Sequence, residues 1–239
     1  MPCFEYVNKS EWKPLKAEAN VVIMRVKAFI RKYYPDLDFT YGLVGSGKNN
    51  LITREVGGNR GFDFDYNFYI PADHLWRVSA RDVHYAFMNA IRYAVRGSLF
   101  DDPEESTSVF TIKYKDKKGK RIICSCDFAI VCHDGLGNFY YLHDYKESGG
   151  FGMSVRSFRF DVEDRVSEIV RRCPGGWNRI RDEYLKLKNA DRQNKRSFVL
   201  YVEAVNNVYN GVFYGISPVD QFLSLASGGI NYPSAFWRP

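Results

Sequence analysis

The chain has 239 residues, 45% of them hydrophobic and 16% aromatic, with a formal net charge of +6. This composition is enough for a packed core and excludes an intrinsically disordered chain. No apolar run approaches the roughly 18 residues of a membrane span, and the N-terminus lacks the pattern of a signal peptide. Five cysteines without scaffold-like spacing indicate reduced thiols. We therefore expect a cytoplasmic protein with no membrane contact.

The first part of the chain predicts one helix followed by two strands. Pro14 fits the first turn of a helix, and apolar residues then recur at helical spacing until Pro35 ends it. A strand is expected over residues 39–44. A second strand is expected over residues 62–70, and a glycine-rich basic loop over 47–61 joins the two.

The next segment predicts one more helix and the remainder of a sheet. Ser79 is a good N-cap for a helix that ends near Gly97. Apolar runs at 109–114 and 121–131 flank a basic turn and indicate a β-hairpin. The segment 138–145 is expected to be the last strand.

Beyond about residue 156 the apolar spacing becomes helical. Asp161 begins the first expected helix, and Pro174 with the two following glycines ends it. Trp177 lies in the apolar stripe of a second helix. Ser197 caps a third, which Gly211 is expected to stop. A short fourth helix and an irregular tail are expected after residue 217.

Two aspartates and a glycine–serine turn form the most informative pattern. Asp63 and Asp65 lie two residues apart on an expected strand, so their side chains share one face, roughly 6–7 Å apart. Carboxylates this close repel each other unless a cation lies between them. Mg²⁺ prefers carboxylate oxygens together with substrate phosphates. Backbone N–H groups at Gly45 and Ser46 can donate to an anion, so a phosphate cradle would lie one loop away.

This pattern resembles the nucleotidyltransferase superfamily of DNA polymerase beta. In that family an apolar residue, Gly, and Gly or Ser precede an Asp-x-Asp pair. Here Gly45 and Ser46 precede Asp63 and Asp65 by a spacer of 16 residues, longer than is usual in the family. The family carries a third carboxylate on a later, neighbouring strand, and Asp127 matches it. The resemblance covers about the first 130 residues and indicates the superfamily, not the substrate.

The resemblance implies a metal-dependent enzyme. It would move a nucleoside monophosphate from a nucleoside triphosphate, such as ATP, to a hydroxyl acceptor and release pyrophosphate. The expected ligands of Mg²⁺ or Mn²⁺, which are also the expected catalytic residues, are Asp63, Asp65 and Asp127. The expected nucleotide-binding residues are Gly45, Ser46, Lys48 and Lys195. An RNA or a nucleotide is the expected acceptor.

The resemblance, together with the helical spacing beyond residue 156, predicts an α+β fold in two domains. A nucleotidyltransferase-like catalytic domain is expected over residues 1–155, with a mixed, mostly antiparallel sheet flanked by helices. A helical C-terminal domain is expected over residues 156–239.

A P-loop NTPase is the competing enzyme class. Residues 42–49 differ by one position from a Walker A loop, because Asn49 stands where a Ser or Thr would hold Mg²⁺. A P-loop would also open a helix, whereas three glycines between 57 and 61 break the following segment. Whether residues 49–60 form a helix distinguishes the two classes.

Non-catalytic interpretations also remain. The aspartates could belong to a solvated strand face, although their aromatic neighbours predict a largely buried strand. The basic loop 47–61 is either a triphosphate clamp or a solvated hairpin. A nucleotidyltransferase-like regulatory, antitoxin or phage-defence binding module is the main alternative to an enzyme. The intact carboxylates of Asp63, Asp65 and Asp127 argue against it.

Positive charge concentrates in residues 156–196, which hold 12 Lys and Arg against 7 Asp and Glu. Basic helices beside an acidic centre would suit a negatively charged acceptor. The alternative is that these residues only solubilise the helices. The candidates are Arg171, Arg172, Arg179, Arg181, Lys195 and Arg196.

Overall fold

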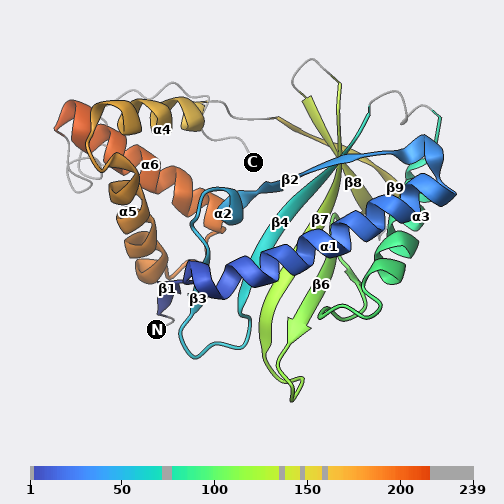
Figure 1. The fold of residues 1–239 in the computed structure, drawn as a ribbon. Coiled ribbons are helices and arrows are strands. Elements are labelled where there is room, and N and C mark those ends of the chain that lie inside the picture. The colour runs from blue at the N-terminus through green and yellow to red at the C-terminus, as the bar shows by residue number, and fades with distance from the viewer. Residues whose placement is uncertain (1–2, 72–76, 135–137, 146–148, 158–160, 216–239) are drawn as a thin grey trace. The chain divides into compact units, whose positions relative to one another are not determined.

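A computed structural model describes residues 3–71, 77–134, 138–145, 149–157 and 161–215 (Figure 1). The chain divides into two compact units, Met1–Phe158 and Arg159–Pro239.

The first unit contains a large mixed sheet, a small two-stranded sheet and two long helices. Its elements, in chain order, are β1 Phe4–Tyr6, α1 Lys9–Tyr33, the 3-10 turn η1 Pro35–Leu37, β2 Thr40–Val44, α2 Gly45–Lys48, β3 Thr53–Glu55, β4 Phe62–Ile70, α3 Ala80–Ala94, β5 Glu104–Glu105, β6 Phe110–Lys115, β7 Ile122–His133, β8 Asn138–Tyr145 and β9 Gly150–Ser157.

The large sheet has the strand order β2-β4-β7-β6-β5. Strand β8 pairs with the last three residues of β7 and carries β9 on its other side. Strands β4 and β7 run parallel, and every other described pair is antiparallel. This arrangement confirms the expected α+β class with a mixed, mostly antiparallel sheet.

The helices α1 and α3 cover one face of this sheet (Figure 1). Alternate residues of β4 point into the resulting core, where Phe64 and Phe68 are fully buried. Trp12 on α1 packs edge-on against Phe64, with ring centroids 6.3 Å apart. Because side chains alternate along a strand, the residues between these aromatics point to the opposite face.

Helix α1 begins five residues earlier than the sequence predicts. The backbone N–H of Asn8 donates to Glu11 Oε1 at 3.4 Å, and the buried Trp12 anchors the first turn to the core. Glu11 also accepts a hydrogen bond from Arg54 at 2.5 Å. Pro14 therefore lies inside the helix, because tertiary contacts extend the helix on the N-terminal side of the proline.

The segment after Ser46 rules out the P-loop interpretation. Only the four residues of α2 are helical, and residues 53–55 form the strand β3, which pairs with β1. Arg54, expected in a free loop, lies in β3 and forms ion pairs with Glu5 and Glu11. A Walker A loop would continue into a long helix, so the P-loop alternative is wrong.

The sheet does not end at residue 145 as the sequence predicts. Strand β9 follows and pairs along its whole length with β8. Its sequence contains Gly150 and Gly152, and glycine is disfavoured in isolated strands. Pairing with a complete neighbouring strand satisfies its backbone groups despite the weak local propensity.

The second unit consists, in its described part, of α4 Asp161–Arg172, α5 Gly176–Ala190 and α6 Ser197–Tyr214. The three expected helices are present. Helix α6 continues past Gly211 to Tyr214, and Gly215 adopts the left-handed conformation that ends it. The expected fourth helix and the tail after residue 217 lie outside the described residues.

Among the helices that the structure describes, none combines the length and the hydrophobicity needed to cross a membrane.

Two glycines with left-handed backbones test how tightly the large sheet packs. At Gly61, with φ of +63°, an added Cβ would lie 2.3 Å from the backbone oxygen of Ile123. At Gly119, with φ of +66°, an added Cβ would meet nothing within 4 Å. We expect Gly119→Ala to lower the free energy of unfolding by about 1–2 kcal/mol, the strain of a left-handed residue. Gly61→Ala adds a backbone clash, so it should lower that free energy at least twice as much. Urea denaturation of both variants measures the difference, and equal losses would contradict the packing described.

Candidate functional site

Three carboxylates project from one face of the large sheet. In the parallel pairing of β4 with β7, Asp65 lies opposite Asp127, and Asp63 lies opposite Ser125. All three aspartates occupy the strand positions between core residues, so they point away from α1 and α3. The structure thus places the three residues that the sequence nominates on one face of two adjacent strands. Their role as metal ligands stays a prediction.

The register of β4 is fixed by its own sequence. Phe62, Phe64 and Phe68 must face the core, because each is almost completely buried. A slip of one residue would turn those rings to the other face and drive Asp63 and Asp65 into the core. The hydrophobic side of the strand therefore determines where the carboxylates lie.

Gly45 directly follows β2 and lies against the side chain of Asp65. Its neighbour Val44 pairs with Asp65, and its backbone has a φ of +59°. An added Cβ at Gly45 would lie 2.6 Å from Asp65 Oδ2. The chain therefore needs glycine here for conformation and for space. Ser46 follows on α2, and its carbonyl accepts a hydrogen bond from the N–H of Leu51 at 2.9 Å, which folds the next loop back.

Two of the three carboxyl groups, those of Asp65 and Asp127, have raised pKa values. Burial, together with the charges of Asp63 and Asp127, raises the pKa of Asp65 to about 7. Burial also raises the pKa of Asp127, although a hydrogen bond from Thr111 and the charge of Lys113 oppose the rise. When they are ionised, the carboxylates on this face of the sheet therefore repel one another, and a bound cation would reduce that repulsion.

Asp127 is held by its neighbour on β6. Thr111 lies opposite Asp127, and its hydroxyl donates to Asp127 Oδ1 at 2.6 Å. Lys113 shares the face of Thr111, and its ammonium pairs with Glu104. These neighbours were not predicted. The alternation of Ile112 with Thr111 and Lys113 is the signal that could have placed polar side chains beside Asp127.

The donor set fits a hard divalent cation. Within the described ranges no three His, Cys, Asp or Glu side chains converge closely enough to hold a metal ion. The three aspartates nevertheless offer carboxylate oxygens from adjacent strands, which is the ligand chemistry that Mg²⁺ and Mn²⁺ prefer. Their mutual repulsion in the absence of a cation favours separation of the side chains. Asp63, Asp65 and Asp127 are therefore the residues that would hold a metal.

The two lysines expected to bind the nucleotide lie in different surroundings. Lys48 is exposed at the end of α2, directly after the Gly45 turn. Lys195 lies in the second unit, just before α6, and its ammonium pairs with Glu203 Oε1 at 2.7 Å. A nucleotide role for Lys195 would require it to leave or share this partner, and that role stays a prediction.

Some basic side chains of the second unit form ion pairs with acidic residues of the same unit. Arg172 pairs with Glu168 at 3.1 Å, as Lys195 does with Glu203. Arg171, Arg179 and Arg196 are exposed, and their side chains have no hydrogen-bond or ion-pair partner in the described part of the chain. Arg171, Arg179 and Arg196 are therefore stronger candidates for contacting an anion than Arg172 and Lys195.

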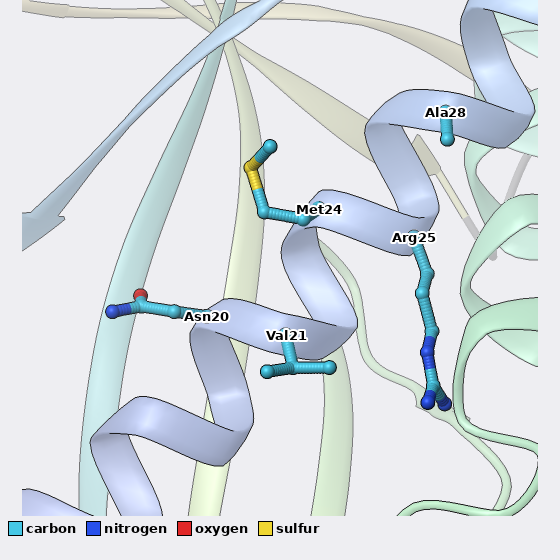
Figure 2. A pocket seen from close by; sticks show the side chains of 5 residues that line it. All are labelled: Asn20, Val21, Met24, Arg25 and Ala28. Carbon is cyan, nitrogen blue, oxygen red and sulfur yellow. The ribbon is translucent and has the colours of Figure 1, made fainter.

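A shallow pocket lies elsewhere on the first unit. It is lined by Asn20, Val21, Met24, Arg25 and Ala28, all on α1 (Figure 2). Helix α1 packs on the core face of the sheet, opposite the carboxylates. This pocket is therefore separate from the candidate site.

Comparison with known proteins identifies the fold. No protein-family model matches the sequence, and no curated protein matches it. Solved structures do match. The cyclic AMP-GMP synthase DncV of Vibrio cholerae, a prokaryotic cGAS homologue, aligns over 84% of this chain and 68% of its own, with a TM-score of 0.55 and 12% identity. The chain has the nucleotidyltransferase fold.

Two further solved structures with the nucleotidyltransferase fold match over similar lengths. CdnC of Escherichia coli, solved with ATP, aligns over 98% of this chain and 74% of its own, with a TM-score of 0.53 and 16% identity. DncV of Escherichia coli, bound to 3′-deoxy GTP, aligns over 84% of this chain and 68% of its own, with a TM-score of 0.54 and 14% identity. At these identities the likeness establishes the fold alone.

The raised pKa of Asp65 predicts how stability depends on pH without metal. Its ordinary value is 3.8, and the folded value is about 7. The folded protein therefore binds the proton more tightly than the unfolded chain, and its stability falls as pH rises from about 4 to 7. Asp65→Asn removes this loss. We expect the variant to be more stable than the wild type at pH 8, by no more than about 4 kcal/mol, since one pKa unit is about 1.4 kcal/mol.

The difference between Asp65→Asn and wild type should be smallest at pH 4, where Asp65 is protonated in the folded protein and roughly half protonated in the unfolded chain. Urea denaturation in EDTA at pH 4, 6 and 8 measures the curve. A stability difference that does not change with pH would show that Asp65 titrates normally.

Proposed function

We propose that this chain is a metal-dependent nucleotidyltransferase that transfers a nucleoside monophosphate from a nucleoside triphosphate to a hydroxyl acceptor. The observation that carries the proposal is the register that sets Asp65 opposite Asp127, with Asp63 on the same face and Gly45 directly against Asp65. Three acids on one face of the sheet, with the pKa values of Asp65 and Asp127 raised, beside a turn of backbone N–H groups, suit a triphosphate with its cations better than any structural role.

The three carboxylates would have different roles, two toward the triphosphate and one toward the acceptor hydroxyl. Bound Mg²⁺ or Mn²⁺ would neutralise the phosphates and stabilise the entering and leaving oxygens. Asp63 and Asp65 lie closest to the Gly45 turn and would face the triphosphate. Asp127 would face the acceptor and help to take the proton of its hydroxyl. The deprotonated oxygen would attack the α-phosphorus, and pyrophosphate would leave.

The Gly45 turn would hold the leaving pyrophosphate. Backbone N–H groups around Gly45 and Ser46, with the Ser46 hydroxyl, suit the β- and γ-phosphate oxygens. Lys48 ends α2 on the same segment and would add a positive charge. Because the turn directly follows β2, which pairs with β4, the cradle is tied rigidly to the carboxylates.

The solved neighbours support a nucleotide as the acceptor. Structures of the Vibrio cholerae enzyme include a GTP complex and a complex with the linear intermediate pppA(3′,5′)pG. In that intermediate one nucleotide has received another on its hydroxyl. Variants of the enzyme with two aspartates replaced by alanine, or one replaced by asparagine, have also been solved. We therefore favour a nucleotide acceptor over RNA for this chain. The cytoplasm stays the expected compartment.

Removing single carboxylates tests the reaction. We expect Asp63→Asn, Asp65→Asn and Asp127→Asn each to lower turnover at least about 100-fold, because even outer partners of a metal site contribute 10- to 100-fold. The assay incubates the protein with each α-labelled nucleoside triphosphate and Mn²⁺, without RNA and with pooled RNA, and separates the products.

The control for the carboxylate variants is Asp36→Asn, which removes an exposed acid on η1, at the opposite end of β2 from the Gly45 turn. It should behave as wild type. Wild-type turnover in any of the three site variants would contradict the assignment of that residue. If label were incorporated only when RNA is present, the acceptor would be RNA and not a nucleotide.

Gly45 offers a separate test of the phosphate cradle. We expect Gly45→Ala to weaken binding of a non-hydrolysable ATP analogue roughly tenfold or more, because its Cβ would displace Asp65 and disturb hydrogen bonds to charged phosphates, each contributing about 1.5–3 kcal/mol. Gly57→Ala is the matched control, with φ of +74° and no atom within 4 Å of an added Cβ. Calorimetry measures both affinities. Equal affinity in the two variants would place the phosphates elsewhere.

A further inference from the structure

The carboxylate of Asp127 has one partner in the part of the chain that the structure describes. Thr111 donates its hydroxyl to Asp127 Oδ1 at 2.6 Å, from the directly opposed position on β6. This distance is typical of a hydroxyl donating to an ionised carboxylate. No other hydrogen bond or ion pair of that carboxylate is present among the described residues. The side-chain orientation of Asp127 therefore depends on a single donor.

The chemical type of this donor matters. A cationic partner would neutralise Asp127 and weaken its attraction for a metal or for the proton of an acceptor. Lys113 is near enough to influence Asp127 electrostatically, but its ammonium is paired with Glu104 instead. Thr111 supplies a neutral donor, which orients the carboxylate and leaves its negative charge available.

Threonine is also stiffer than the other hydroxyl side chain. Its β-branch restricts χ1, so the hydroxyl direction is largely set once the strand has formed. Strand β6 is held on both sides, by β7 and by β5, at this position. The donor to Asp127 is thus fixed by the sheet itself.

We propose that Thr111 is a positioning residue for Asp127. It holds Oδ1 through its hydroxyl and so directs the remaining lone pairs of the carboxylate toward the cation and the acceptor. This inference rests on the proposed function of the site. It means that a neutral side chain on the neighbouring strand β6 sets the orientation of the third carboxylate, Asp127.

The test compares two substitutions at the same position. Thr111→Val keeps the shape and the β-branch and removes only the donor. Thr111→Ser keeps the donor. Thr40→Val is the matched control, because Thr40 is an exposed strand threonine that pairs with Tyr69, four residues along β4 from Asp65. Mn²⁺ binding in the presence of a non-hydrolysable ATP analogue is followed by electron paramagnetic resonance, and kcat and KM are measured separately.

We expect Thr111→Val to weaken Mn²⁺ binding about 10- to 100-fold, as the loss of an outer partner of a metal ligand does. It should lower kcat more than it raises KM for the triphosphate, since Asp127 faces the acceptor. Thr111→Ser should restore both to within a few-fold of wild type. Thr40→Val should match wild type, and all variants should keep the wild-type thermal midpoint to within a few degrees.

Two results would overturn the positioning role while leaving the proposed function intact. One is wild-type Mn²⁺ binding and kcat in Thr111→Val, together with loss of both in Asp127→Asn. The other is an equal loss in Thr111→Val and Thr111→Ser, which would assign the effect to packing. A wild-type protein that binds no Mn²⁺ with the analogue, and in which Asp127→Asn changes nothing, would instead refute the proposed function itself.

Discussion

The parallel pairing of β4 with β7 is the constraint on which the site depends. It sets Asp65 opposite Asp127 while the aromatic residues of β4 fill the core beneath α1 and α3. Neither strand can shift by one residue without burying a carboxylate and exposing an aromatic ring. The hydrophobic effect thus positions charged groups that would otherwise separate. The acidic face is a consequence of packing on the other side of the same strands.

This arrangement links folding to ligand binding. In the absence of a cation, burial and like charges raise the pKa of Asp65 to about 7, so the ionised site opposes the folded state. A cation that binds only the folded protein would reverse this effect and stabilise it by mass action. The glycine at position 45 fits the same logic, because it lets the backbone approach Asp65 more closely than any side chain would allow. The repulsion among the carboxylates and the close approach of the Gly45 backbone to Asp65 therefore occur at one place.

Much of this could be predicted from the sequence, and the failures have physical reasons. Strands β4 and β8 have the predicted bounds, because long alternating or apolar runs determine them locally. Strand β9 contains two glycines and forms only because β8 is complete beside it. Strand β3 has three residues, too few for a periodic signal. Helix α1 starts before Pro14 because Arg54 and the core, both distant in sequence, hold its first turn.

The residues of the candidate site likewise divide into those that the sequence predicts and those that only the structure reveals. The aspartates and Gly45 were found because they carry a motif within one short stretch and one later strand. Thr111 was not found, since a single threonine on a strand has no motif, and only the register of β6 against β7 reveals its contact. Lys195 was nominated from charge alone, and its ion pair with Glu203 is a contact that composition cannot show.

The central claim is that Asp63, Asp65 and Asp127 together hold the divalent cation of a bound nucleotide. The most direct measurement is a crystal structure of the protein with Mn²⁺ and a non-hydrolysable nucleoside triphosphate, with anomalous scattering recorded at the manganese edge. The account predicts anomalous peaks within about 2.0–2.3 Å of carboxylate oxygens from all three aspartates, with the triphosphate against Gly45 and Ser46. Manganese bound elsewhere, or a nucleotide bound away from this face of the sheet, would contradict it.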